Sequence, residues 1–184
     1  MERTIRAAVI AVSALLIYGV VYAITDAKFD KLAGLLPQEE SAVTAAERER
    51  QLDCLAINIY REAGYEPFEG KVAVAQVTMN RVAHPEFPKD VCAVVYEKNA
   101  WSGRVVCQFS WYCDSAHRNR PIGAGYEESY EVAKRVLLEG FRLPGLADAL
   151  FYHADYVNPQ WRLDRITQIG AHIFYRPRTK AQDV

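Results

Sequence analysis

The sequence lacks an excess of charge of either sign: Lys and Arg total 22, Asp and Glu total 23, and the formal net charge is −1. Proteins that bind nucleic acid draw much of their affinity from surplus basic side chains that displace counterions, so this balance argues against a nucleic-acid partner. Internal repeats and low-complexity tracts are also missing. Hydrophobic residues make up 51% of the 184 positions, which excludes a disordered chain and indicates one folded domain.

Several common catalytic signatures are missing as well. The sequence has no G-x-S-x-G elbow for a serine nucleophile and no H-E-x-x-H pair for a catalytic zinc. The four histidines are scattered, and the C-x5-C-x3-H spacing that begins at Cys107 is not a structural zinc pattern. We therefore expect no metal and no cofactor, which leaves the carboxylates as candidates for catalysis.

Charge is absent from one long stretch, residues 7–24, which reads AAVIAVSALLIYGVVYAI. As a helix that rises about 1.5 Å per residue it reaches about 27 Å, close to the thickness of the membrane hydrocarbon core. Arg3 and Arg6 precede it, which predicts a cytoplasmic N-terminus. We expect an uncleaved signal anchor at residues 1–24 in the inner membrane, with the rest of the chain in the periplasm. The alternatives are a cleaved secretory signal, with secretion, and a buried core helix.

The expected export of the chain affects how its four cysteines are interpreted, because disulfides can form in an oxidising compartment. Four cysteines allow three pairings. Cys107 and Cys113 flank a short aromatic segment and can close a loop by forming a disulfide, which leaves Cys54 to pair with Cys92. The sequence favours this pairing and does not exclude the other two.

The exported part divides into a linker, a folded domain and a tail. Residues 25–46 carry too little periodic apolar content for a core, so we expect a linker there, a domain at residues 47–178 and a tail at 179–184. Apolar spacing and capping residues predict helices from about Ala45 to Gly64, from Pro67 to before Pro85, from Asp90 to Glu97 and from Glu127 to Glu139. Strand-like runs cover residues 105–113, 149–153 and 166–175. This order predicts a compact α+β fold with several helices and a small antiparallel sheet, preceded by one N-terminal transmembrane helix.

Glu62 lies at the C-terminal end of the first predicted helix. Ile59 and Tyr60 supply apolar surroundings, and the negative end of the helix dipole disfavours a carboxylate charge, so both effects raise the pKa of Glu62. A carboxylic acid that stays protonated near neutral pH can donate a proton to a leaving glycosidic oxygen. An isolated glutamate at a helix end is more often a solvated surface charge, so position alone does not decide between the two.

Three segments, in order, resemble the SleB-type (spore cortex-lytic) cell-wall hydrolases. They read CLAINIYREAGYEPFEGKVAVAQVTMNRV, VCAVVYEKNAWSGRVVCQFSWYCD and FYHADYVNPQWRLDRITQIGAHIFYR, and the resemblance covers about Leu52 to Arg176. It implies a lysozyme-like catalytic domain that cleaves peptidoglycan glycan strands at the β-1,4 bond between N-acetylmuramic acid and N-acetylglucosamine.

The resemblance also implies roles for particular residues. The family's catalytic glutamate falls on Glu62, and the second glutamate of the same motif falls on Glu66. Where the family usually has Arg-Gly before that second glutamate, this chain has Gly64-Tyr65, so the turn glycine stands one position earlier. His172 also falls on a motif position, where a core histidine is the more common structural role. We expect substrate to contact Tyr60, Glu66, Asn80, Gln108, Ser110, Tyr152 and Trp161.

A glycosidase ordinarily uses two carboxylates, and Glu62 is the one obvious candidate here. Glu66, Glu69 and Asp114 are the further candidates. A single glutamate suffices if it acts first as acid and then as base while the muramic acid 6-hydroxyl attacks C1, as in lytic transglycosylases, which yields 1,6-anhydromuramic ends. The alternatives are a non-catalytic peptidoglycan-binding module and an amidase or peptidase that acts on stem peptides.

Overall fold

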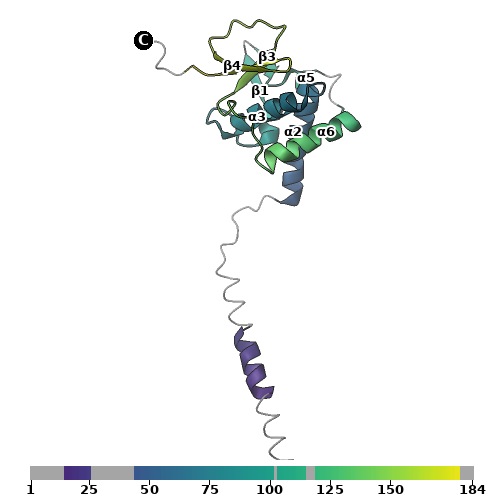
Figure 1. Ribbon diagram of the computed structural model, residues 1–184, viewed down its shortest axis with the longest axis vertical. Coiled ribbons are helices and arrows are strands. Elements are labelled where there is room, and N and C mark those ends of the chain that lie inside the picture. Colours follow the sequence, from purple (N-terminus) through teal and green to yellow (C-terminus); the bar gives the residue numbers. More distant parts are fainter. Residues whose placement is uncertain (1–14, 26–43, 102, 115–118, 179–184) are drawn as a thin grey trace, which may run out of the picture. The chain divides into compact units, whose positions relative to one another are not determined.

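The structure, a computed structural model, describes residues 15–25, 44–101, 103–114 and 119–178 (Figure 1). The chain divides into two units, Met1–Thr44 and Ala45–Val184. In the first unit, residues 15–25 are helical. Within the described ranges, no helix combines the length and the apolar character that crossing a membrane requires. Residues 1–14 of the expected anchor, most of the expected linker and the tail lie outside these ranges, so the anchor stays a prediction.

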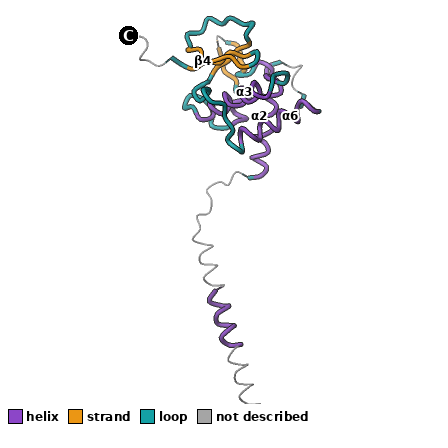
Figure 2. Tube along the Cα trace, viewed as in Figure 1, coloured by secondary structure: helices purple, strands orange, loops and turns teal. Residues whose placement is uncertain are grey.

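The second unit is α+β, as predicted, with the helices gathered in one layer and the strands in another (Figure 2). Its longer helices are α2 (Ala45–Ala63), α3 (Phe68–Ala83) and α6 (Ala124–Leu137), and the shorter ones are α4 (Val91–Val95) and α5 (Ser110–Cys113). The predictions for α2, α3 and α4 are confirmed. Asp90 caps α4, its carboxylate accepting a hydrogen bond from the Ala93 amide at 2.8 Å. Helix α6 begins at Ala124 rather than the predicted Glu127.

Helix α3 is the centre of the core, because α2 and α6 both pack on it and its residues Gly70–Thr78 are all buried. Its buried polar side chains are paired. Lys71 Nζ lies 2.8 Å from a Glu128 carboxylate oxygen of α6, and Gln76 both donates to the Leu143 carbonyl and accepts from the Leu143 amide. Because a buried polar group without a partner is costly, these pairs fix which segments can cover α3.

The strands form two antiparallel sheets. β1 (Lys98–Trp101) and β2 (Arg104–Cys107) make a hairpin, while β3 (Phe151–Ala154), β4 (Asp164–Ile169) and β5 (His172–Arg176) lie in the order β3-β5-β4. Two strand predictions were wrong. The run from Ile166 to Tyr175 is two strands joined by a turn at Gly170, which has φ +58°. A positive φ suits glycine and ends the strand there.

The second error concerns residues 105–113, which are not one strand. β2 ends at Cys107, and Ser110–Cys113 is the short helix α5. The disulfide between Cys107 and Cys113 explains this, because their Cα atoms are 5.8 Å apart, whereas six extended residues span about 20 Å. A disulfide that closes this short loop is incompatible with an extended strand, and of the two predicted features the structure contains the disulfide.

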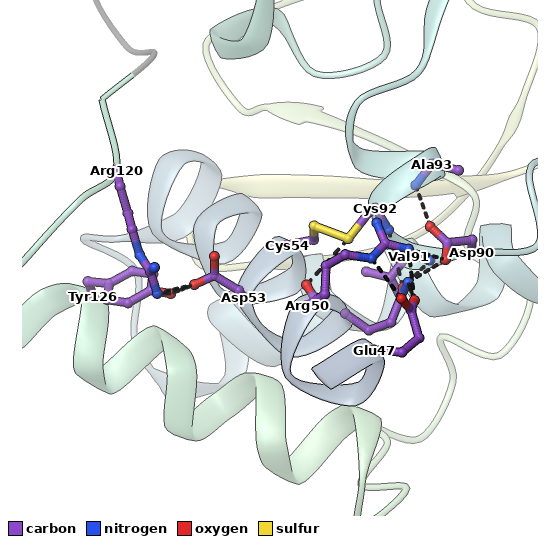
Figure 3. Close-up of a disulfide and its surroundings, with 11 residues drawn as sticks. Glu47, Arg50, Asp53, Cys54, Asp90, Val91, Cys92, Ala93, Arg120 and Tyr126 are labelled. Atoms are coloured by element: carbon purple, nitrogen blue, oxygen red, sulfur yellow. Dashed lines mark hydrogen bonds and ion pairs between the residues drawn. A yellow bond between two sulfur atoms is a disulfide. The ribbon is translucent and has the colours of Figure 1, made fainter. Parts of the chain in front are cut away.

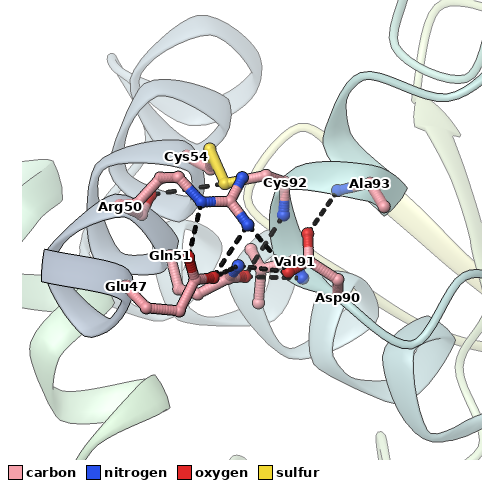
Figure 4. Close-up of polar contacts among 8 residues, drawn as sticks. All are labelled: Glu47, Arg50, Gln51, Cys54, Asp90, Val91, Cys92 and Ala93. Atoms are coloured by element: carbon pink, nitrogen blue, oxygen red, sulfur yellow. Dashed lines mark hydrogen bonds and ion pairs between the residues drawn. A yellow bond between two sulfur atoms is a disulfide. The ribbon is translucent and has the colours of Figure 1, made fainter. Parts of the chain in front are cut away.

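Both favoured disulfides, Cys54–Cys92 and Cys107–Cys113, are confirmed. The first joins α2 to α4 (Figure 3). A polar network surrounds it (Figure 4): Gln51 Oε1 accepts from the amides of Val91 and Cys92, and Arg50 pairs with Glu47 and Asp90. The hydrogen bond from Arg50 lowers the pKa of Glu47 to about 2. The disulfide therefore closes a contact that hydrogen bonds also hold.

Loop length predicts that the two disulfides contribute unequally to stability. Closing 38 residues removes more unfolded-state entropy than closing 6, about 4 kcal/mol against about 2 kcal/mol. We expect the Cys54→Ser/Cys92→Ser double variant to lower the free energy of unfolding about twice as much as Cys107→Ser/Cys113→Ser. Urea denaturation of both variants measures this, and a larger loss for the shorter loop contradicts it.

Candidate active site

Glu62 lies in the last turn of α2, where it faces the sheet. The hydroxyl of Tyr152, from β3, donates a hydrogen bond to Glu62 Oε2 at 3.1 Å. Helix α2 ends immediately afterwards at a tight turn: a Cβ atom on Gly64 would lie 2.5 Å from the Tyr60 carbonyl oxygen, so only glycine fits. The helix end thus presents one carboxyl group to a sheet that is distant in sequence.

The surroundings favour the protonated form of Glu62. Burial raises the pKa of Glu62, while the hydrogen bond from Tyr152 and the charge of Arg81 act in the opposite direction and offset part of that rise. Burial likewise raises the pKa of Tyr152 well above its ordinary value, so Tyr152 remains a hydrogen-bond donor. The direction agrees with the prediction from sequence, with burial as the main cause.

Arg81 is a buried cation beside this carboxyl group, and sequence reasoning missed it. Its Nε donates to the Leu150 carbonyl at 2.9 Å, and its guanidinium lies 5.2 Å from the centre of the Phe109 ring. With the amide of Gln108 oriented to place its oxygen inward, that oxygen accepts from Arg81 Nη1 at 3.0 Å and Nη2 at 3.3 Å. Arg81 stands in the quoted segment directly after Asn80, which was the available signal. Burial lowers the pKa of Arg81.

Two hollows meet at Glu62, and Ser110 and Tyr152 also line both of them. The larger, about 520 Å³, is polar and is lined in addition by Arg61, Trp111, Asp114, His153, Ala154, Tyr156 and His172. The smaller, about 290 Å³, continues along Arg81, Cys107, Gln108, Phe109, Phe151 and Trp161. Together they form a groove, named here the Glu62 groove, in which a polymer can lie on both sides of the carboxyl group.

The groove brings together four of the residues that we expected to contact substrate: Gln108, Ser110, Tyr152 and Trp161. The indole of Trp161 is 45% exposed and stands edge-on to His153 and Tyr175, with ring centres 5.5 and 5.9 Å away. His153 and Tyr156 also line the groove and were not singled out from the sequence.

The other three expected contacts, Tyr60, Glu66 and Asn80, line neither hollow. Asn80 donates to the carbonyls of Leu146 and Ala149 at 2.7 and 2.9 Å. Glu66 Oε2 accepts from the Ala171 amide at 3.1 Å, which fastens the β4–β5 turn to the start of α3. Tyr60 packs edge-on against Tyr126, with ring centres 6.4 Å apart. Each of these contacts joins segments that are distant in the sequence.

Among the further carboxylates considered, Asp114 alone lines the groove with Glu62. Glu69 is exposed at the start of α3. Across the part of the chain that the structure describes, no group of three or more His, Cys, Asp or Glu side chains is placed to hold a metal ion.

His172 is buried, as expected of a core histidine, yet it also reaches the groove. Its ring meets the Tyr152 ring edge-on at 5.2 Å, and its Nδ1 is buried without a hydrogen-bond partner among the described residues. Burial lowers the pKa of His172, which favours the neutral ring at neutral pH. His172 therefore supports Tyr152 by packing rather than by charge.

Comparison with known proteins identifies a family and a relative. Residues 65–175 match the family described as Cell Wall Hydrolase. The spore cortex-lytic enzyme of Bacillus subtilis (strain 168) is 32% identical over 127 residues, which are 65% of this chain and 35% of that protein. The chain thus spans about a third of that relative's length.

Two solved structures share the fold. The catalytic domain of the Bacillus cereus SleB protein matches with a TM-score of 0.52 and 27% identity over 70% of this chain and 91% of that one. The catalytic domain of the germination-specific lytic transglycosylase SleB from Bacillus anthracis matches with a TM-score of 0.52 and 26% identity, over 77% and 100% respectively. The family resemblance found in the sequence is confirmed.

The hydrogen bond from Tyr152 predicts a measurable effect on the titration of Glu62. Replacing Tyr152 by Phe removes a donor that favours the carboxylate, so the pKa of Glu62 moves further upward. Carboxyl carbon chemical shifts, followed against pH by NMR, report this value. The control is Tyr175→Phe, which removes a hydroxyl that bonds to His153 instead. An unchanged or lower pKa in Tyr152→Phe contradicts the assigned contact.

Proposed function

The chain belongs to the cell wall hydrolase family, and from that premise we propose that it cleaves peptidoglycan glycan strands as a lytic transglycosylase. The bond cleaved is the β-1,4 linkage between N-acetylmuramic acid and N-acetylglucosamine. One observation carries the proposal: a partly buried carboxyl group, Glu62, lies where the two hollows of the groove meet, so that the groove continues on both sides of it. A chain cut internally needs binding space on both sides of the reacting bond.

The reaction begins with Glu62 protonated. Its proton passes to the glycosidic oxygen as the bond from that oxygen to C1 of muramic acid breaks, and Glu62 becomes a carboxylate. The carboxylate then takes the proton of the muramic acid 6-hydroxyl, whose oxygen bonds to C1. The products are a 1,6-anhydromuramic end and a new N-acetylglucosamine end, and Glu62 is protonated again.

The surroundings of Glu62 suit both steps, the donation of its proton and the later uptake of another. Burial favours the acid form that starts the cycle, while Tyr152 and Arg81 stabilise the carboxylate formed halfway. Because both forms must be reachable, a carboxyl group with opposing influences suits this cycle better than one that is only buried. Cleavage therefore weakens as the pH rises through the pKa of Glu62.

The walls of the groove offer groups that suit a glycan. Gln108 and Ser110 carry an amide and a hydroxyl that can bond N-acetyl groups and sugar hydroxyls. The exposed indole of Trp161 offers a flat face on which a sugar ring can stack. These contacts hold the strand while Glu62 acts.

Glu62→Gln tests the role of the acid, because the amide keeps the shape of the side chain and cannot donate a carboxylic proton. We expect cleavage of purified peptidoglycan to fall by about 10²- to 10⁴-fold. The urea midpoint stays equal or rises, since the amide carries no charge to desolvate. Mass spectrometry of the native protein's products shows anhydromuramic ends. An active Glu62→Gln protein, or products with only reducing ends, contradicts the mechanism.

We also propose that residues 1–24 anchor the chain in the inner membrane, so that the domain faces the periplasm. The support is the uncharged run at residues 7–24 with Arg3 and Arg6 before it. The native chain is expected to remain in the membrane fraction after carbonate extraction, and a chain lacking residues 1–24 to become soluble. A soluble native chain whose N-terminus has been removed indicates a cleaved signal instead.

A further inference from the structure

A third hollow adjoins the Glu62 groove and is not used by the reaction described above. It encloses about 390 Å³, and its lining includes Asp53, Tyr96, Trp111, Tyr112 and Arg120. Trp111 also lines the larger half of the groove, so one side chain is a wall common to both spaces. This space is named here the side hollow.

Trp111 is held firmly in that position. Its indole Nε1 donates to Asn58 Oδ1 at 3.1 Å, and Asn58 Nδ2 in turn donates to Thr78 Oγ1 at 3.2 Å. Asn58 and Thr78 are fully buried in α2 and α3. A buried chain of hydrogen bonds therefore fixes the wall, and the two spaces keep their relative positions.

The rest of the side hollow is aromatic on one side. Tyr96 and Tyr112 are half-buried, with ring centres 4.7 Å apart, and each lies about 6 Å from Trp111 (6.1 and 6.0 Å). Such a surface receives the apolar part of a ligand and offers hydroxyl groups at its edges.

An ion pair stands on the other side. Arg120 Nη2 lies 2.6 Å from Asp53 Oδ1, and the Tyr126 hydroxyl donates to the same carboxylate (Figure 3). The Arg120 side chain is 63% exposed and that of Asp53 is 26% exposed, so both charges can meet a ligand. Arg61 supports this edge, since its Nη2 donates to the Asn119 carbonyl at 2.6 Å. A balanced pair suits a zwitterion, with a carboxylate for Arg120 and an ammonium for Asp53.

The spacing between the side hollow and Glu62 is comparable to the reach of a short peptide. Asp53 and Glu62 lie nine residues apart on α2, which corresponds to about 14 Å along the helix axis. Extended peptide covers about 3.3 to 3.6 Å per residue. A peptide attached to a sugar beside Glu62 therefore brings the backbone of its third residue about 10 to 11 Å away, and the long side chain of that residue extends further, towards the level of Asp53.

We propose that the side hollow binds the stem peptide of the muramic acid at the cleavage site. The peptide's diamino acid, at its third position, places its carboxylate on Arg120 and its ammonium on Asp53, and its methylene chain on the aromatic wall. This proposal rests on the proposed function, because it takes peptidoglycan as the substrate. A neutral sugar in the side hollow would leave the ion pair without a complementary group.

Isothermal titration calorimetry on the full-length Glu62→Gln chain tests binding without cleavage. The probe is the tripeptide L-alanyl-γ-D-glutamyl-meso-diaminopimelate, and the comparison probe is a neutral N-acetylglucosamine oligomer. We expect Arg120→Gln, added to this chain, to weaken tripeptide binding by about tenfold or more, since a charge-assisted bond is lost. The matched control is Arg48→Gln, an exposed arginine of α2 outside the lining of the side hollow.

Retention of tripeptide affinity in Arg120→Gln overturns the proposal, as does a tripeptide that does not bind. A second measurement uses cleavage itself: the ratio of kcat/KM on intact peptidoglycan to kcat/KM on strands stripped of peptides by an amidase. That ratio should fall towards one in Arg120→Gln and stay at the native value in Arg48→Gln. If the chain cleaves no glycan, the proposed function fails, while the calorimetric result still decides whether the side hollow binds the peptide.

Discussion

The hydrogen bond from Tyr152 to Glu62 is the contact on which the site depends, because it joins the helical layer to the sheet. Helix α2 alone would leave the carboxyl group in water. Burial requires β3 to lie across the helix end, and β3 is held there by Arg81, which bonds to the Leu150 carbonyl, and by its pairing with β5. Glu66 holds the start of β5, since its carboxylate accepts a hydrogen bond from the Ala171 amide. The raised pKa of Glu62 is thus a product of tertiary packing, and it depends on residues distant from Glu62 in the sequence.

Opposing influences on one carboxyl group suit the double role that we propose for Glu62. Burial disfavours the charge of Glu62, and Tyr152 and Arg81 favour it. Burial alone would produce an acid that resists ionisation, whereas the Tyr152 hydrogen bond and the Arg81 charge alone would produce a carboxylate with no proton to give. Arg81 can exert this influence from within the core because Gln108, Phe109 and the Leu150 carbonyl satisfy its guanidinium. The second carboxylate of an ordinary glycosidase is replaced in this scheme by a hydroxyl of the substrate.

Local patterns in the sequence predicted the elements that local forces decide. The apolar spacing gave α2 and α3, Asp90 gave the start of α4, and the cysteine spacing gave the staple from Cys107 to Cys113. One error was local: the strand predicted at residues 105–113 conflicted with the disulfide predicted for Cys107 and Cys113. The other errors arose where distant contacts decide. Nothing within residues 166–175 except Gly170 signals a turn, and the turn is held by Glu66 from another element. The burial of Arg81 and the shared wall at Trp111 likewise depend on partners far along the chain, which periodicity cannot reveal.

Three motif positions line no part of the groove, and their contacts bear on whether the site tolerates the unusual Gly64-Tyr65 pair. Tyr60, Glu66 and Asn80 join elements, so a resemblance at these positions reflects the scaffold as well as the chemistry. Gly64 occupies the one place where the Tyr60 carbonyl leaves no room for a side chain, and Tyr65 points fully into solvent. Glu66 still reaches the Ala171 amide. With the turn glycine one position earlier, Glu62 still contacts Tyr152 and Glu66 still holds the sheet, which argues that the proposed site works rather than that it is a remnant.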